Sequence, residues 1–314
     1  MNFDVPRDVL LTPEIPAATA CENGAEITFS DQLRAVYRAD QRALYSRWTP
    51  LPRPCFNPRL LADLRAYTSF VANSGGTFEH GGESGPIEYV VVASDVPGVF
   101  NLGGDLDLFS QLIFARDRAG LLRYGRACID VLHPNYCGYG LPVTTVSLVQ
   151  GEALGGGFEC ALSSDVIVAE KSARMGFPEI LFNLFPGMGA YSFLDRRVGQ
   201  RSAEAIITSG QIYTAEQMHA MGVVDVVCED GQGDAALAAL IRKRRRSQNG
   251  IAATAAARRR VHRLEFSELL DVVEIWVDAA LRVNPVDLKL MQRLVKRQNQ
   301  LGEPAVAAAL DTLH

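Results

Sequence analysis

Four runs of apolar residues stand out in the middle of the chain, and segments with helical spacing separate most of them. The runs cover residues 89–93 (YVVVA), 143–149, 166–169 and 223–227. Near-continuous apolar runs of this kind are typical of strands that are buried on both faces. Residues 106–132, between the first two runs, have helical spacing. The alternation predicts an α/β fold with parallel strands joined by right-handed helical crossovers.

The N-terminal part of the chain carries weaker patterns. Residues 1–30 are aperiodic and contain several prolines, so we expect an irregular segment that lies over the surface. Two strand-like runs follow, at residues 33–37 and 43–49. The short polar segment between them predicts a β-hairpin.

A proline-rich segment at residues 50–58 is incompatible with regular structure, because proline lacks the backbone N–H that a helix or a sheet needs. Asn57 followed by Pro58 is a typical helix start, and the helix is predicted over residues 59–73. The glycine-rich residues 74–85 predict a loop.

From about residue 234 the chain is predicted to be helical. The expected helices cover residues 234–264, 267–283 and 285–300. The chain therefore divides into an irregular start (1–30), an α/β core (31–233) and a C-terminal helical region (234–314) that serves as a lid or in oligomerisation.

Composition narrows the function. The 314 residues are 48% hydrophobic and 21% charged, as expected of a globular protein with a sizeable core. The formal net charge of -5 gives no indication of nucleic-acid binding. The cysteines form no CxxC pair and the histidines lack metal-ligand spacing, so we expect reduced thiols, no metal and no cofactor. Neither a signal peptide nor a membrane span is indicated, which favours a cytoplasmic location.

Two glycine-rich loops lead into predicted helices. They are residues 155–157 (GGG) and residues 100–105 (FNLGGD), which follow the run at 89–93. Glycine lets backbone N–H groups approach a ligand closely. Two such loops at adjacent strand ends can direct one N–H each at a single carbonyl oxygen, which is the geometry of an oxyanion hole. Taken alone, each loop also fits a phosphate-binding loop or a plain turn.

Two glutamates have unusually apolar sequence neighbours. Glu159 comes one turn into the helix that the glycines open, and Glu179 lies in the run MGFPEILFNLFPG. A carboxylate among apolar residues is unfavourable unless it has a partner or a function. Two carboxylates in one dry pocket are driven apart in pKa and can act as an acid and a base. The alternative for either glutamate is an ordinary solvated surface residue.

The motifs FNLGGDL, GEALGGGFE and GFPE, at these distances, resemble those of the crotonase (enoyl-CoA hydratase/isomerase) superfamily over roughly residues 30–300. This resemblance implies a crotonase-like spiral of ββα units with a C-terminal helical region. It implies that Gly104 and Gly156 donate the two oxyanion hydrogen bonds and that Glu159 and Glu179 are catalytic. Because several branches keep only one glutamate, the presence of both indicates hydration or dehydration.

Within the superfamily the chain resembles the diffusible signal factor (DSF) synthases, the RpfF-like proteins, most clearly in GFPEILFNLFPGMGAYSFL. The resemblance implies dehydration of a 3-hydroxyacyl chain on acyl carrier protein and thioester hydrolysis, which release a cis-2-unsaturated fatty acid for quorum sensing. It assigns Met188, Trp276 and Leu294 to the acyl pocket, where each also fits an ordinary core position. A homo-oligomer, trimeric or hexameric, and a sensor histidine kinase are the protein partners that it implies.

Charge bears on the carrier of the acyl group. Ordinary CoA hydratases have a basic residue where the helix after the first oxyanion loop begins, whereas this chain has Asp105 and Asp107. Residues 242–246 (RKRRR) and 258–260 (RRR) are a candidate docking surface for an acidic carrier protein, or a solvated helix face. Three functions stay open: a DSF synthase, an ordinary enoyl-CoA hydratase/isomerase acting on CoA-bound substrates, and a regulatory binding protein on a crotonase frame.

Overall fold

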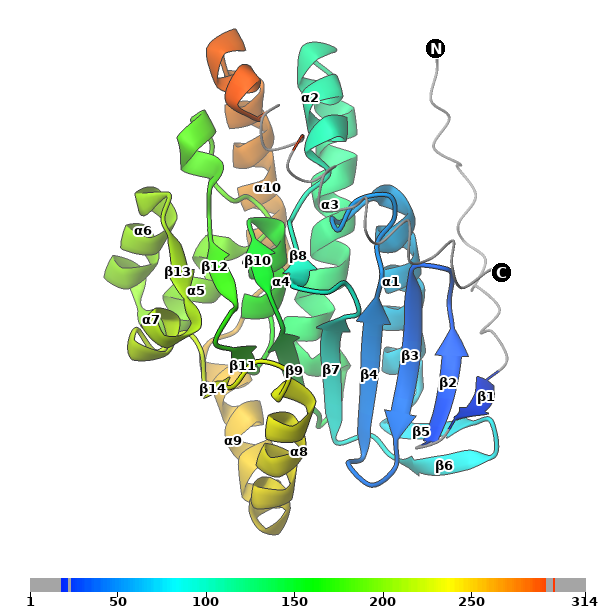
Figure 1. The fold of residues 1–314 in the computed structure, drawn as a ribbon. Helices are drawn as coiled ribbons and strands as arrows, with labels where there is room; N and C mark the ends of the chain where they lie inside the picture. The colour runs from blue at the N-terminus through cyan, green and yellow to red at the C-terminus, as the bar shows by residue number, and fades with distance from the viewer. Residues whose placement is uncertain (1–17, 22–23, 292–295, 297–314) are drawn as a thin grey trace.

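An eight-stranded sheet forms the centre of the protein (Figure 1), in the order β1-β2-β3-β4-β7-β9-β11-β14. The computed structural model describes residues 18–21, 24–291 and 296. The strands of the large sheet are β1 (Ala18–Cys21), β2 (Gly24–Thr28), β3 (Leu33–Arg38), β4 (Ala43–Trp48), β7 (Tyr89–Ser94), β9 (Thr144–Val149), β11 (Val166–Glu170) and β14 (Val226–Cys228).

The sheet is antiparallel from β1 to β4 and parallel from β4 to β14. The predicted parallel α/β core is confirmed, since β7, β9, β11 and β14 coincide with or overlap the four apolar runs. The predicted β3–β4 hairpin is confirmed as well. The irregular start predicted for residues 1–30 is wrong for β1 and β2. In β2 only Ala25 and Ile27 are buried, an alternation too short to stand out in the sequence.

The segment between β4 and β7 carries α1 (Pro58–Asn73) and a small hairpin of β5 (Thr77–His80) and β6 (Glu83–Pro86). Helix α1 begins as predicted, because the Asn57 side chain accepts a hydrogen bond from the Leu60 N–H at 2.9 Å. The loop predicted for residues 74–85 is wrong. Phe78 anchors the hairpin by stacking on Tyr37, with ring centroids 4.4 Å apart.

A second, four-stranded sheet lies above the first and carries both glycine loops. Its order is β13 (Ile212–Thr214), β12 (Arg174–Gly176), β10 (Glu152–Leu154) and β8 (Val99–Asn101). Strands of three residues are too short for a periodic pattern, so they could not be predicted from the sequence. Strand β8 leads into residues 102–105, and β10 leads into residues 155–157.

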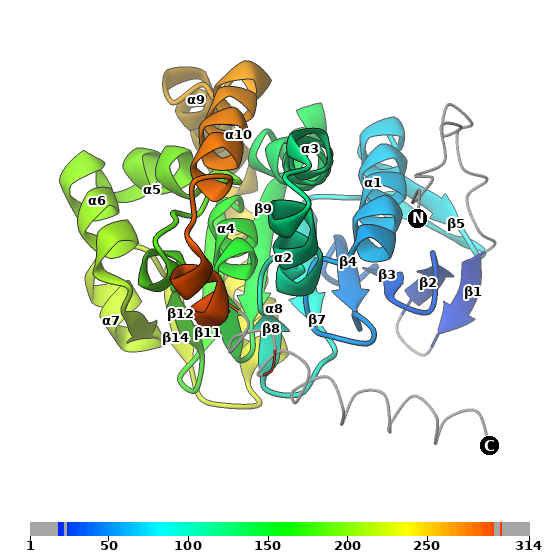
Figure 2. The ribbon, with the colours of Figure 1, turned by 90° about the horizontal axis from the view of Figure 1, so that it is seen from above.

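Helices α1, α3 and α4 lie on one face of the large sheet, and α10 packs on α3 (Figure 2). The predicted helix over residues 106–132 is two helices, because Arg116 adopts a left-handed φ of 51° and Asp117 caps the second one. The helices after β8 are α2 (Leu106–Phe114), α3 (Arg118–Tyr136), α4 (Gly156–Leu162), α5 (Ala190–Val198), α6 (Gln200–Ser209), α7 (Ala215–Ala220), α8 (Gly233–Arg244), α9 (Gln248–Val261) and α10 (Phe266–Ala280).

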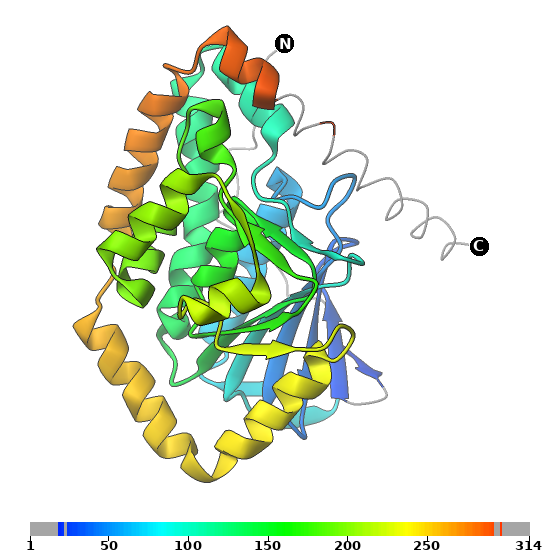
Figure 3. The same cartoon turned by 60° about the vertical axis from the view of Figure 1, so that its left-hand side comes forward.

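Helices α8 and α9 form an arm that points away from α2 (Figures 1 and 3). The single helix predicted for residues 234–264 is wrong, since the short 3-10 helix η3 (Arg245–Ser247) separates the two. Leu237 and Ile241 of α8 cover the second face of the sheet, so β7 is buried on both faces, as its apolar run predicted. Residues 285–291 are helical, and the remainder of the helix predicted for 285–300 is outside the described residues except for residue 296.

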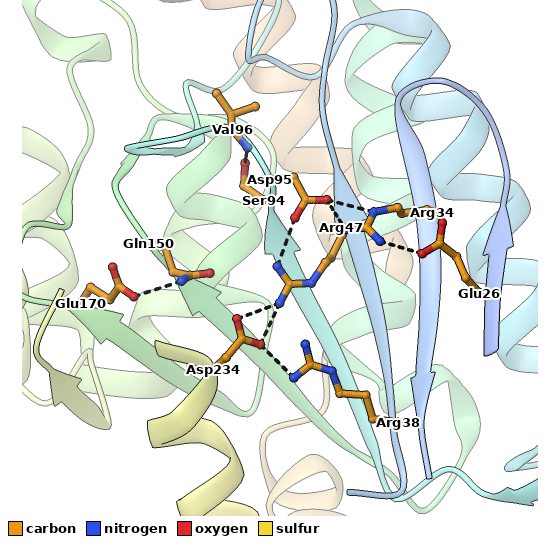
Figure 4. A network of polar contacts seen from close by, with 10 residues as sticks. All are labelled: Glu26, Arg34, Arg38, Arg47, Ser94, Asp95, Val96, Gln150, Glu170 and Asp234. Atoms are coloured by element: carbon orange, nitrogen blue, oxygen red, sulfur yellow. Dashed lines mark hydrogen bonds and ion pairs between the residues drawn. The ribbon is translucent and has the colours of Figure 1, made fainter. Parts of the chain in front are cut away.

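Ion pairs fix the start of α8 to the sheet (Figure 4). The carboxylate of Asp234 accepts hydrogen bonds from Arg38 at 3.0 Å and from Arg47 at 2.7 Å. Arg47 also bonds to Asp95, at 3.1 Å. Because Arg47 is largely buried, these contacts are better shielded from solvent than ordinary surface pairs, and they hold the arm in place.

Candidate active site

The two glycine loops and the two glutamates meet at one cavity of about 40 Å³, which is room for about three water molecules. Its lining includes Gly104, Gly156, Glu159, Glu179, Met188 and Trp276. Six of the seven site residues expected from the sequence therefore lie around one space. The seventh, Leu294, is outside the described residues.

The backbone nitrogens of the two loops lie side by side. A Cβ atom placed on Gly156 would be 3.4 Å from the nitrogen of Gly104. A Cβ atom on Gly103, whose φ is +90°, would be 2.8 Å from the nitrogen of Gly156 and would obstruct it. Glycine at position 103 therefore allows the two loops to approach each other this closely.

Glu159 is held by backbone donors from a distant part of the chain. Its Oε1 accepts hydrogen bonds from the N–H groups of Met188 at 2.8 Å and Ala190 at 2.9 Å. Ala190 is the first residue of α5, so the carboxylate lies at the positive end of that helix. Burial raises the pKa of Glu159 to about 7, and the two N–H donors limit the rise.

Glu179 begins the short 3-10 helix η2 (Glu179–Phe182) and faces the same cavity. Burial raises the pKa of Glu179 to about 8, and the negative charge of Glu159 contributes to the rise. Among the described residues, its Oε2 has no hydrogen-bond partner. Its Oε1 lies so close to Gly155 that a Cβ atom there would collide with it. Glycine at position 155, with φ of +52°, thus makes room for the carboxyl group.

Comparison with known proteins places this geometry in a family. Residues 76–269 match the family described as enoyl-CoA hydratase/isomerase. The chain belongs to this family. Over 151 residues it is 32% identical to the mitochondrial methylglutaconyl-CoA hydratase of Mus musculus, a stretch that makes up 48% of this chain and 46% of that enzyme. The chain therefore matches less than half the length of that relative.

The fold of this chain is similar to that of solved structures. A human mitochondrial delta3-delta2-enoyl-CoA isomerase superposes with a TM-score of 0.69 at 19% identity, covering 86% of this chain and 99% of the isomerase. DspI of Pseudomonas aeruginosa superposes with a TM-score of 0.57 at 22% identity, covering 85% and 95% of the two chains. The crotonase-like α/β fold expected from the motifs is confirmed.

Two carboxyl groups whose pKa values lie near neutral pH can give up and accept protons there, and Glu159 and Glu179 both line this cavity. Glu179 has the higher pKa and Glu159 has the two N–H donors. Near neutral pH the pair therefore holds one proton, mainly on Glu179, with the charge on Glu159. Each carboxyl group is close to the pKa at which general acids and bases are most effective.

These raised pKa values predict that the protein loses stability as pH rises. In the unfolded chain both groups ionise near 4.5, whereas in the folded chain they stay protonated up to about pH 7 and 8. The free energy of unfolding should therefore fall between about pH 4.5 and pH 8. Glu179→Gln, which is neutral throughout, should melt several degrees higher than the wild type at pH 8 and at a similar temperature at pH 4.5. Calorimetry across this range, with the exposed Glu216→Gln as a control, checks the prediction. Equal melting temperatures at pH 8 would contradict it.

Aromatic rings that pack on glycines form one side of the cavity. Trp276 of α10 lies 5.0 Å from Phe109 of α2, measured between ring centroids. A Cβ atom on Gly187 would collide with Trp276, and one on Gly104 would come within 2.7 Å of the Phe109 ring. Trp276 is fully buried and also lines the cavity, so its position fits either an acyl-pocket residue or a core residue. The place of Phe109 in the cavity wall was not predicted from the sequence.

Two polar residues have places that the sequence did not suggest. Asn183, the polar neighbour of Glu179 in the sequence, adopts a left-handed φ of 58°. Its side chain bonds to Asp287 at 3.1 Å, and its backbone N–H donates to the main-chain carbonyl of Glu179. Arg53 of the proline-rich segment pairs with Asp105 at 2.8 Å and lies 3.6 Å from Asp107. The guanidinium therefore offsets part of the negative charge beside the first loop, which weakens the argument from the two aspartates against a CoA substrate.

Two further absences hold for the described residues. No group of three histidine, cysteine or acidic side chains there is arranged to hold a metal ion. No helix in that part of the chain is long and apolar enough to cross a membrane.

Proposed function

We propose that the chain dehydrates a 3-hydroxyacyl thioester and then hydrolyses the thioester, releasing a cis-2-unsaturated fatty acid of the DSF type. The supporting observation is that two buried carboxyl groups with raised pKa values share one cavity with the adjacent backbone nitrogens of Gly104 and Gly156. The motif GFPEILFNLFPGMGAYSFL, which resembles DSF synthases, supports this choice within the family.

In the dehydration step the thioester carbonyl accepts hydrogen bonds from the N–H groups of Gly104 and Gly156, which stabilise the enolate. The step starts from the less populated form of the pair, with the proton on Glu159, and Glu179, as the carboxylate, removes the α-proton. Glu159, as the carboxylic acid, protonates the departing 3-hydroxyl group, which leaves as water. The proton of the pair ends on Glu179 and the charge on Glu159.

With the proton on Glu179 and the charge on Glu159, the pair is ready for thioester hydrolysis. Glu159, now a carboxylate with two N–H donors, accepts a proton from a water molecule that attacks the carbonyl carbon. The same backbone N–H groups stabilise the tetrahedral intermediate. The carrier thiolate leaves and takes a proton from Glu179, which yields a free thiol and the free acid.

An ordinary enoyl-CoA hydratase is the second candidate, and two observations favour it. Hydration requires Glu179 protonated and Glu159 charged, which is the distribution that the pKa values of the resting site favour. Arg53 beside the first loop offers a cation near the place where CoA hydratases carry a basic residue.

Product analysis separates the two candidates. The purified protein is incubated with 3-hydroxyacyl thioesters of several chain lengths, loaded on acyl carrier protein and on CoA, and the products are measured by mass spectrometry. Release of free cis-2-enoic acid is expected of the proposed synthase. Reversible formation of enoyl-CoA without free acid would favour the hydratase, and no turnover of either series would contradict both.

The arm formed by α8 and α9 carries the basic residues that are candidates for docking the carrier protein. Residues 242–246 lie where α8 ends, on the far side of the molecule from α2 (Figure 3), and α9 buries none of its residues within one chain. We therefore propose that a trimer or hexamer forms through the arm. In such an assembly a neighbouring copy can bring the basic run near a cavity mouth, where an acidic carrier protein docks.

Charge reversal in this run should weaken the use of carrier-bound substrate. Arg245→Glu with Arg246→Glu should raise the KM for acyl carrier protein substrates, and more strongly at low salt, because screening weakens such contacts. The KM for CoA substrates should stay unchanged. Arg201→Glu, on the exposed side of α6, is the control for net charge. Equal turnover of both donors that is unaffected by the reversals would contradict docking of a carrier here.

A further inference from the structure

The proline-rich segment at residues 50–58 runs beside the first glycine loop and is bonded to it through backbone groups. The N–H of Leu102 donates to the carbonyl of Pro54 at 2.8 Å, and the N–H of Phe56 donates to the carbonyl of Gly103 at 2.8 Å. Phe56 and Gly104 form an isolated parallel bridge. The segment thus holds the loop that carries the first proposed oxyanion donor.

The Phe56 hydrogen bond determines where the Gly104 N–H points. The carbonyl of Gly103 and the N–H of Gly104 belong to one planar trans peptide, so they point in opposite directions. Fixing the Gly103 oxygen therefore fixes the direction of the Gly104 N–H. This matters because Gly103 and Gly104 are both glycines, whose backbone would otherwise rotate freely.

The hydroxyl of Tyr124 closes this arrangement from the other side. It accepts a hydrogen bond from the N–H of Asp105 at 3.0 Å and donates one to the carbonyl of Phe56 at 2.5 Å. The peptide that follows Gly104 is therefore held by Tyr124, and the peptide that precedes it is held by Phe56. Tyr124 comes from α3, and its ring packs on Phe109 at 4.7 Å between centroids.

We propose that Tyr124 is a positioning residue, whose hydroxyl ties Phe56 to Asp105 and so directs the Gly104 N–H at the thioester carbonyl. The inference rests on the proposed function, in which Gly104 is an oxyanion donor. Tyr124 is buried, and burial raises its pKa well above the usual value of a tyrosine, so the hydroxyl keeps its proton throughout the working pH range.

Tyr124→Phe tests the inference, because it removes the hydroxyl and keeps the ring. Loss of one oxyanion donor costs about 10²–10³-fold in kcat, so loss of its support should cost roughly 10–100-fold with little change in KM. The second readout is the infrared carbonyl stretch of bound crotonyl-CoA, which hydrogen bonds in an oxyanion hole shift to lower frequency. In Tyr124→Phe this stretch should move back toward its solution value.

Tyr139→Phe is the matched control. Tyr139 is also buried, and its hydroxyl donates to the Asn135 side chain at 3.1 Å, away from the residues that line the cavity. Its removal should lower the melting temperature by a similar amount and leave kcat and the carbonyl stretch unchanged. Should Tyr124→Phe fail to fold, 3-fluorotyrosine at position 124 replaces it. Fluorine makes the hydroxyl a stronger donor and a weaker acceptor, so the carbonyl stretch should move from its wild-type value.

The outcomes separate the two proposals. If the wild type shifts the carbonyl stretch of crotonyl-CoA but turns over no thioester, the proposed function is overturned. The infrared comparison of wild type and Tyr124→Phe then still tests the role of Tyr124. A folded position-124 variant with wild-type carbonyl frequency overturns the inference alone. A wild type that leaves the carbonyl stretch at its solution value also overturns it, because there is then no oxyanion hole to position.

Discussion

Glu179→Gln should reduce kcat by at least about 10³-fold while the protein stays folded, because general acid–base groups typically contribute about 10²–10⁴-fold. Glutamine has nearly the same shape as glutamate but neither gives up nor accepts a proton at neutral pH. The site already holds Glu179 mainly in its neutral form, so the substitution leaves the charge of the resting cavity almost unchanged. Rates measured with 3-hydroxyacyl and enoyl thioesters, together with the melting temperature, check the prediction.

Glu159→Gln should give a loss of similar size while the protein stays folded. Its side-chain amide keeps one acceptor oxygen for the N–H groups of Met188 and Ala190, and it removes a buried charge that the raised pKa of Glu159 shows to be unfavourable overall. The double variant Glu159→Gln/Glu179→Gln should be hardly slower than either single variant, because the two groups act as one proton-transfer unit. Losses that simply multiply would show that the two residues act independently.

Glu216→Gln, an exposed change on α7, is the control for a general effect of losing a carboxylate, and it should keep wild-type rates. Binding separates chemistry from recognition, since Glu179→Gln should still bind crotonyl-CoA with near wild-type affinity. A Glu179→Gln enzyme that retains more than about a tenth of the wild-type kcat would contradict the two-carboxylate mechanism, given the usual size of such contributions.

The sequence predicted the elements whose pattern is long or chemically marked. The run YVVVA became β7, and Asn57 with Pro58 became the start of α1. The three-residue strands β8 and β10 were missed, although they hold both glycine loops, because three residues show no period. Strands β1 and β2 were missed for a related reason, since both are short.

The site was predictable where it is made of side chains in marked motifs. Glu159, Glu179 and the two glycines were predicted, and the structure brings them to one cavity. The donors to Glu159 were not predictable, because a backbone N–H leaves no mark on the residue types at 188 and 190. Arg53 and Tyr124 were missed because they reach the first loop from distant segments, and only the fold places them there.

Trp276→Ala should have the largest effect on stability and should also change the product. The indole is 2% exposed, and truncation of a buried tryptophan costs about 3–5 kcal/mol. For a chain of this size that corresponds to a fall in melting temperature of roughly 5–8 °C. The same change removes the largest side chain of the cavity wall. Because the cavity holds only about 40 Å³, a fatty acyl chain has to displace part of this wall, and a smaller residue admits more of it.

Chain-length preference therefore distinguishes a pocket residue from a core residue. Each buried methylene contributes about 0.8 kcal/mol, or roughly fourfold in affinity, so a wall moved by one indole should shift the preferred substrate by at least one methylene toward longer chains. Phe78→Ala is the matched control, because Phe78 is fully buried in the β5–β6 hairpin and does not line the cavity. It should lose comparable stability and keep the wild-type product profile. If Trp276→Ala loses stability but keeps the wild-type chain-length profile, Trp276 is a core residue alone. The wall of the acyl pocket would then have to be formed by Phe109 and Met188.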